Sequence, residues 1–282
     1  MNSPRALVLA FLAAAATLAG ASPRALIVCA PGYPGTTVEA QPAMDALARG
    51  ASAAAGWQEG SLAAVYHEKE EAGLARLRGP DAALALVPLP FLVEHGAALA
   101  LTPRLLAIGE GDGSGTWTLV APKGKVGSAS DLAGWEILSI AGYSPRFVVG
   151  VALSGFGRLP AGARIAFSPA ILSALRRSAR GEKVAVLLDA SQSAALADLP
   201  FAAQLDRVHT SPPLPGTMLC TVGSRLTPAE IRALTTGLLG LSKRDGGPEL
   251  LRTLRMKRFD AVDVAAIEAL LGLAGEGQGS RP

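Results

Sequence analysis

The sequence is poor in the residues that carry metal and redox chemistry. Its 282 residues include only two cysteines and three histidines. Two cysteines exclude a structural zinc site made of cysteine alone, and His67, His95 and His209 follow no metal-ligand spacing. We therefore expect neither a metal nor a cofactor. The sequence leaves open whether Cys29 and Cys220 form a disulfide bridge or remain two buried thiols.

Charge and aromatic side chains are also sparse. Charged residues make up 17% of the chain and aromatic residues 5%, and the formal net charge is +3. Such a small, dispersed positive charge argues against a nucleic-acid partner. Half of the residues are hydrophobic, which is enough for a sizeable core, and the length suits one large or two medium domains.

The N-terminus reads as a secretory signal. Arg5 supplies a positive start, residues 6–18 form an apolar run, and residues 19–21 are small, as at a cleavage site. The apolar run is too short to span a bilayer. We therefore expect residues 1–21 to be removed near Ala21 and the mature protein to be periplasmic.

Predicted strands alternate with predicted helices along the chain, which is typical of parallel sheets covered by helices. Segments 109–116 and 210–216 interrupt this rhythm. If both are crossovers, residues 116–215 form one lobe and residues 22–115 with 216–274 form the other. The glycine-rich end, residues 275–282, is expected to be a disordered tail.

The stretch Leu138–Gly150 predicts a strand, a glycine turn and a helix start. Ser144 is a good N-cap, and a proline at the next position suits a first helical turn. Predicted helix starts at 128–131 and 227–230 carry their own acidic residue, whereas this one has none. Its free N–H groups, with Arg146 beside them, predict an anion site. The alternatives are a water-capped surface helix and an Arg146 that points away.

The surrounding sequence is of one charge sign. No acidic residue occurs between Glu136 and Glu182, and such a region attracts anions. The alternative is that most of its basic residues are solvated on helix faces. These residues are Arg146, Arg158, Arg164, Arg176, Arg177 and Arg180.

Loops that follow predicted strands supply further candidates, because ligands in such folds bind beyond the C-terminal ends of strands. Asp189 either caps its own helix, the interpretation we prefer, or contacts a cationic group of the ligand, and Thr36 could cap the first long helix. Tyr33 and Tyr143 either contact the ligand or pack at the rim. The predicted ligand-binding residues are Tyr33, Thr36, Pro90, Tyr143, Ser144, Arg146, Asp189, Gln192 and His209.

Several segments resemble the type-two periplasmic binding proteins of ABC importers. Residues 118–124 and 130–135 resemble the entry into the second lobe, and residues 81–91 are similar to the third strand and its ligand loop. Residues 211–216 and the pair Phe259–Asp260 look like the phosphate/phosphonate branch. The resemblance implies an α/β fold of two lobes, each a mostly parallel sheet flanked by helices, joined by a two-strand hinge.

The resemblance also implies closure on a small solute. The phosphonate branch has a Ser/Thr-rich run at the helix start where this chain keeps only Ser144, and Arg146 could replace the missing donors. Gly142, Ser144 and Arg146 do not complete a nucleophile elbow, and the glycines at 111, 113 and 115 precede a strand, which excludes a dinucleotide fingerprint.

We therefore expect a monomeric solute-binding protein, not an enzyme, that delivers a small oxyanion to an ABC permease. Phosphate, phosphite and phosphonate are the expected ligands. Two alternatives stay open. One is an enzyme on the same two-lobe fold acting on a small anionic metabolite, and the other is a ligand sensor without transport.

Overall fold

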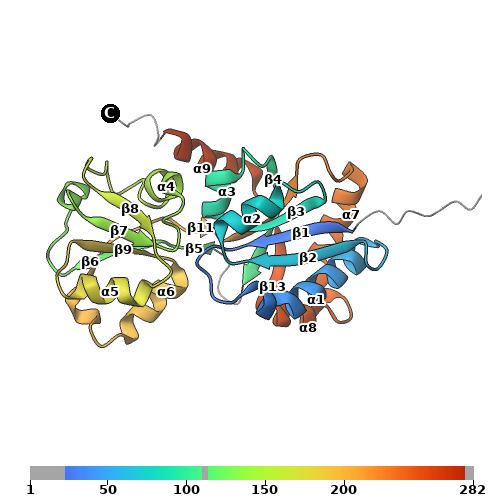
Figure 1. Cartoon of the computed structure of the whole chain (residues 1–282), viewed down its shortest axis with the longest axis horizontal. Helices are drawn as coiled ribbons and strands as arrows, with labels where there is room; N and C mark the ends of the chain where they lie inside the picture. The colour runs from blue at the N-terminus through green and yellow to red at the C-terminus, as the bar shows by residue number, and fades with distance from the viewer. Residues whose placement is uncertain (1–22, 110–113, 277–282) are drawn as a thin grey trace, which may run out of the picture.

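The computed structural model describes residues 23–109 and 114–276, which form two parts lying side by side (Figure 1). Each part is a β-sheet flanked by helices, which confirms the two-lobe α/β fold. The expected secretory signal and residues 277–282 of the expected tail lie outside the described residues. Gly275 and Glu276, which we had assigned to that tail, belong to the last helix.

The larger part, lobe one, is built on a six-stranded sheet. Its strands lie in the order β13 (Met256–Ala261), β4 (Leu101–Gly109), β12 (Thr217–Val222), β3 (Ala82–Pro88), β1 (Arg24–Cys29) and β2 (Leu62–His67). Its helices are α1 (Thr37–Ala55), α2 (Glu70–Leu77), α3 (Leu89–His95), α7 (Pro228–Leu239), α8 (Gly247–Thr253) and α9 (Val264–Glu276), with a 3-10 turn η5 (Leu241–Lys243).

The second part, lobe two, is built on a five-stranded sheet. Its strands lie in the order β10 (Leu205–Thr210), β6 (Thr118–Pro122), β9 (Val184–Leu188), β7 (Glu136–Ser139) and β8 (Arg164–Phe167). Its helices are α4 (Pro145–Phe147), the π-helical turn η2 (Val148–Ala152), α5 (Ile171–Ala179) and α6 (Ala190–Ala195). Short 3-10 turns are η1 (Ala129–Leu132), η3 (Leu196–Asp198) and η4 (Ala202–Gln204).

Both sheets are mixed, but most strands of each sheet run in the same direction, as expected; the reversed strands are β12 and β13 in lobe one and β6 in lobe two. In lobe one β1 runs parallel to β2 and β3, but β12 is antiparallel to β3 and β4, and β4 is antiparallel to β13. The reason is the path of the chain, because β12 returns from lobe two and must run opposite to its neighbours. In lobe two β6 is likewise antiparallel to β9 and β10.

Two short strands lie between the sheets, where the chain passes from one lobe to the other. β5 (Ser114–Gly115) and β11 (Leu214–Pro215) pair antiparallel as a separate ribbon. A second connection is α9, which follows the last strand of lobe one and packs on η2 of lobe two. Figure 1 shows α9 lying across the junction of the two lobes.

Local sequence explains where several elements begin. Thr36 caps α1 and shares a capping box with Glu39, and Thr227 caps α7 with Glu230. In each case the carboxylate three residues on accepts hydrogen bonds from the cap residue, which satisfies free donors at the helix start. All seven residues of β3 are buried, as expected for a strand whose two faces are both covered.

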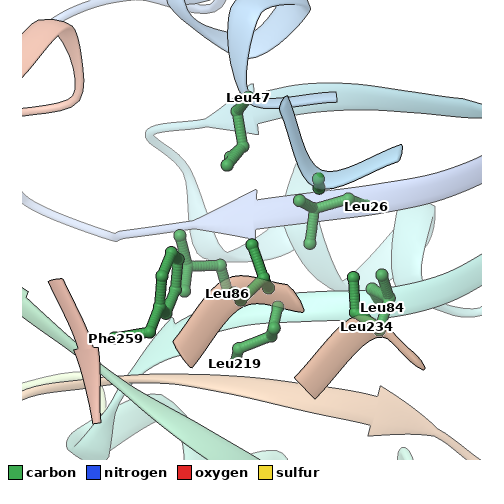
Figure 2. Close-up of a pocket in the computed structure, with 9 residues that line it drawn as sticks. Leu26, Leu47, Leu84, Leu86, Leu219, Leu234 and Phe259 are labelled. Carbon is green, nitrogen blue, oxygen red and sulfur yellow. The ribbon is translucent and has the colours of Figure 1, made fainter. Parts of the chain in front are cut away.

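Apolar residues fill both faces of the larger sheet. One face packs against α1, α7 and α8, and a small void of about 10 Å³ remains there among Leu26, Leu86, Leu219 and Phe259 (Figure 2). An apolar void of this size has room for one water molecule at most, so it is a packing defect and not a ligand site. None of the described helices is long and apolar enough to cross a membrane.

The two cysteines are separate buried thiols. Cys29 lies on β1 and Cys220 on β12, and β3 runs between these strands, so the sulfurs do not form a bridge. Burial raises the pKa of each thiol to about 12. Both groups are therefore neutral at physiological pH and act as small apolar side chains.

Candidate ligand-binding cleft

A cleft of about 630 Å³ lies between the two lobes. Tyr33 follows β1, and Pro88 and Pro90 mark the passage from β3 to α3, so lobe one forms its wall with the C-terminal ends of strands. Lobe two contributes Trp117, just before β6, and residues that follow β9. The remaining wall comes from the connecting ribbon, from the end of β4 and from the start of β12. The lining residues are Tyr33, Pro88, Pro90, Ala107, Gly109, Gly115, Trp117, Asp189, Ala190, Ser191, Ala194, Leu214, Pro215, Gly216 and Thr217.

Asp189 of lobe two and Tyr33 of lobe one lie close enough across this cleft for each side chain to affect the pKa of the other. Asp189 also caps α6, because its Oδ1 accepts a hydrogen bond of 2.8 Å from the Gln192 N–H while Gln192 Oε1 accepts one of 3.2 Å from the Asp189 N–H. Burial raises the pKa of the Asp189 carboxyl, although the hydrogen bonds from Gln192, Ser191 and Tyr33 act in the opposite direction. Burial, and then the charge of Asp189, raises the pKa of the Tyr33 phenol.

Trp117 is a wall residue that is not among the predicted ligand-binding residues. It is only 7% exposed, and its ring meets Phe147 edge-on with 5.0 Å between ring centroids. Its backbone N–H donates a 2.9 Å hydrogen bond to Ser211 Oγ at the return crossover. The available signal was its position, directly after the first crossover and before a buried strand. Trp117 gives the cleft a fixed aromatic wall.

The helix start at Ser144 does not open into this cleft. Ser144 is fully buried, and its Oγ donates a 3.0 Å hydrogen bond to Oε2 of Glu94, which comes from α3 of lobe one. The same Oγ accepts a 3.4 Å hydrogen bond from the Phe147 N–H. The expected acid-free helix start therefore meets a carboxylate from the other lobe, fifty residues away in sequence. The predicted helix start is confirmed, with Ser144 as the N-cap, and α4 continues as the π-helical turn η2 after Phe147.

Comparisons with known proteins were made on the sequence and on the fold. No protein-family model matches the chain, and no curated protein matches it. Among solved structures, chloride-bound XAC2383 from Xanthomonas citri gives a TM-score of 0.71 at 13% identity, over 93% of this chain and 100% of that chain.

Two further solved structures are a component of a phosphonate transporter and a complex with a phosphonate. The binding-protein component of an ABC phosphonate transporter from Pseudomonas aeruginosa gives a TM-score of 0.62 at 15% identity, over 92% of this chain and 88% of that chain. PhnD1 from Prochlorococcus marinus in complex with methylphosphonate gives a TM-score of 0.61 at 16% identity, over 90% of this chain and 98% of that chain. This chain has the fold of the periplasmic binding proteins. At these identities the likeness establishes the fold alone.

Three of the nine residues predicted to bind ligand line the cleft of this periplasmic-binding-protein fold, namely Tyr33, Pro90 and Asp189. Tyr143 and Ser144 lie instead where the lobes touch. Burial raises the pKa of Tyr143, and the nearby groups that add to this include Cys29, Tyr33 and the carboxylates of Glu70 and Glu94. Tyr143 also meets Phe167 edge-on, with 6.1 Å between ring centroids.

The other four predicted residues are engaged elsewhere or are absent from the described wall. The Thr36 hydroxyl and N–H both donate 2.9 Å hydrogen bonds to Glu39 at the start of α1, and Gln192 completes the cap of α6. His209 packs inside lobe two, with Nε2 3.1 Å from the Ala152 carbonyl oxygen. Arg146 is half-buried, and its Nε has no hydrogen-bond partner among the described residues.

The charge of the wall differs from what the sequence predicts. Among the described lining residues Asp189 is the single charged side chain, and no lysine or arginine is present. Around it lie a phenol, the Ser191 hydroxyl, the Trp117 ring and prolines. This wall can accept a hydrogen bond or balance a positive charge at Asp189, and it offers apolar contact elsewhere. In the part of the chain that the structure describes, no group of three or more His, Cys, Asp or Glu residues is placed to hold a metal ion.

Proposed function

We propose that the chain is a solute-binding protein whose two lobes close on a small molecule, and that it delivers this molecule to an ABC permease. The observation that carries the proposal is the 630 Å³ cleft between the lobes, walled by strand ends of both. Small-molecule sites have this size and occur between domains. The fold likeness to binding-protein components of transporters supports it.

The proposed moving parts follow from the connections. Residues 22–115 with 216–274 form lobe one, residues 116–215 form lobe two, and the β5–β11 ribbon is the hinge. Two antiparallel strands can bend together while the sheets stay rigid, which is how such clefts close on a ligand. We propose that residues 1–21 direct export and that the mature protein works as a monomer.

We propose binding rather than catalysis because the described wall holds one carboxylate and neither histidine nor lysine. A nucleophile such as Ser191 needs a neighbouring base to become reactive. Asp189 is engaged with Tyr33 and with its own helix cap instead.

The wall favours a neutral or cationic solute with a hydrogen-bond donor. A donor or ammonium group would reach Asp189 and Tyr33, and an apolar portion would lie against Trp117, Pro88 and Pro90. The second candidate is the small oxyanion that the sequence predicts, which the fold likeness to a methylphosphonate complex favours. The single acidic side chain in the described wall makes it the weaker candidate.

Thermal-shift screening of the purified chain tests both candidates. One panel holds amines, amino alcohols and polyols, and the other holds phosphate, phosphite, methylphosphonate, sulfate and alkyl sulfonates. We expect a member of the first panel to raise the melting temperature, because a ligand that binds only the folded state stabilises it. Asp189→Asn should lose the effect, while Asp198→Asn, at an exposed acid of the same lobe, should keep it. No stabilisation by either panel would contradict solute binding.

A further inference from the structure

The two lobes touch beside the cleft through one carboxylate. Glu94 on α3 of lobe one accepts the hydrogen bond from Ser144 of lobe two, with 3.0 Å between the oxygens. Ser144 is fully buried and Glu94 is half-buried, so the contact is partly shielded from water. The contact joins α3 of lobe one to the helix start that follows β7 in lobe two.

Glu94 supplies a negative charge to the helix start at Ser144. Several other helix starts of this chain have an acidic residue of their own in the first turn. At Thr36, Ser128 and Thr227 the acidic residue three positions on accepts hydrogen bonds from the cap residue. The turn at Ser144 has no acidic residue of its own. A carboxylate from the facing lobe stands in that place instead.

The surroundings of Glu94 are negative. Glu70 lies nearby and binds His95 with 2.6 Å between Oε1 and Nε2, and both carboxylates act on Tyr143. Among the described residues no lysine, arginine or histidine forms an ion pair with Glu94. An oxyanion brought to Ser144 would displace Glu94 and face these like charges.

We propose that Glu94 is a specificity-determining residue that acts as a built-in anion. Its carboxylate occupies the position beside Ser144, excludes free oxyanions from it, and holds the lobes together before a solute enters. This inference rests on the proposed function of solute binding, and it assigns selection against phosphate and phosphonates to the lobe contact beside the cleft.

The test compares anion binding in the full chain and three variants. Glu94→Gln keeps the size of the side chain and an oxygen acceptor for Ser144 but removes the charge. Ser144→Ala keeps the charge and removes the hydrogen bond. Glu71→Gln removes a carboxylate at an exposed position of α2 and serves as the matched control. Methylphosphonate and sulfate are the probes, titrated by calorimetry at low salt.

We expect Glu94→Gln to bind at least one probe about tenfold or more tightly than the wild type, which corresponds to removal of one nearby like charge. Ser144→Ala and Glu71→Gln should gain nothing. Tight binding of a probe by the wild type, or no gain in Glu94→Gln, would overturn the proposal.

Two further measurements keep the outcomes separate. Near-ultraviolet circular dichroism shows whether Glu94→Gln is folded, and Glu94→Ala replaces it if it is not. The amine and polyol panel is run on the wild type in parallel. If a member of that panel binds while Glu94→Gln gains no oxyanion affinity, the role of Glu94 fails and the proposed function stands. If nothing in either panel binds to the wild type and Glu94→Gln does gain oxyanion affinity, the role of Glu94 stands and the proposed function fails.

Discussion

The packing of α9 on lobe two makes Gly150→Ala a sharp test of how the lobes are connected. A β-carbon added at Gly150 would lie 2.8 Å from both the Ala274 Cα and the Leu273 carbonyl oxygen of α9. Both neighbours are backbone atoms, which cannot turn aside as a long side chain can. Overpacking of this kind costs about 1–3 kcal/mol.

The expected change in stability has the opposite sign to that of a glycine-to-alanine change at an ordinary helix position. Alanine is favoured over glycine inside a helix by about 1 kcal/mol, and Gly150 lies within the helical turn η2. Gly272 in the middle of α9 provides the control, because an added β-carbon meets nothing within 4 Å there. Gly272→Ala should therefore stabilise the protein and Gly150→Ala should destabilise it.

Thermal unfolding followed by circular dichroism measures both variants. One kcal/mol corresponds to about 2–4 °C in a protein of this size, so we expect Gly150→Ala to melt about 4 °C lower and Gly272→Ala about 2 °C higher. If Gly150→Ala melts at or above the wild-type temperature, α9 does not pack closely on η2, and the second connection between the lobes is wrong.

Three further predictions concern buried groups. The folded state raises the pKa of Asp189 and so holds its proton more tightly than the unfolded chain does. The free energy of unfolding should therefore fall as pH rises from the ordinary carboxyl pKa to the raised one, and Asp189→Asn should gain stability relative to the wild type over that range in urea unfolding. The same pH dependence in both proteins would contradict this. The thiols of Cys29 and Cys220, with pKa values of about 12, should react with a disulfide reagent at pH 8 only after unfolding, and rapid labelling of the native protein would refute their burial. Phe147→Ala should lower the free energy of unfolding by about 3–5 kcal/mol and shift the fluorescence emission of Trp117 to longer wavelength. Phe147→Leu should have a much smaller effect on both. An unchanged emission in Phe147→Ala would show that Phe147 does not support the cleft wall.

Local patterns predicted most of the elements because hydrophobic runs and caps are set by neighbouring residues. The capping boxes at Thr36 and Thr227 form as their spacing indicates. β13 escaped prediction because it is an edge strand with one buried residue, Phe259, among charged and half-exposed ones. The antiparallel pairs also escaped, because they depend on where the chain returns from lobe two.

The cleft was predicted in part, because topology brings the ends of neighbouring strands together. That rule placed Tyr33, Pro90 and Asp189 correctly in its wall. It could not predict that Glu94 meets Ser144, since this contact depends on how two separate sheets face each other. No spacing in the sequence records that arrangement.

Counting charges along the chain overstates the free positive charge, and the ion pairs give the physical reason. The stretch between Glu136 and Glu182 contains no acid, but these two residues at its ends fold back against its arginines. Glu136 pairs with Arg164 and Arg177 at 3.2 and 3.1 Å, and Glu182 pairs with Arg177 and Arg180, each at 2.8 Å. Three of the six arginines thus balance local carboxylates beside β7 and α5 and supply no field for a distant anion. In the described part of the cleft wall the charged side chain is Asp189, which lies outside that stretch of sequence.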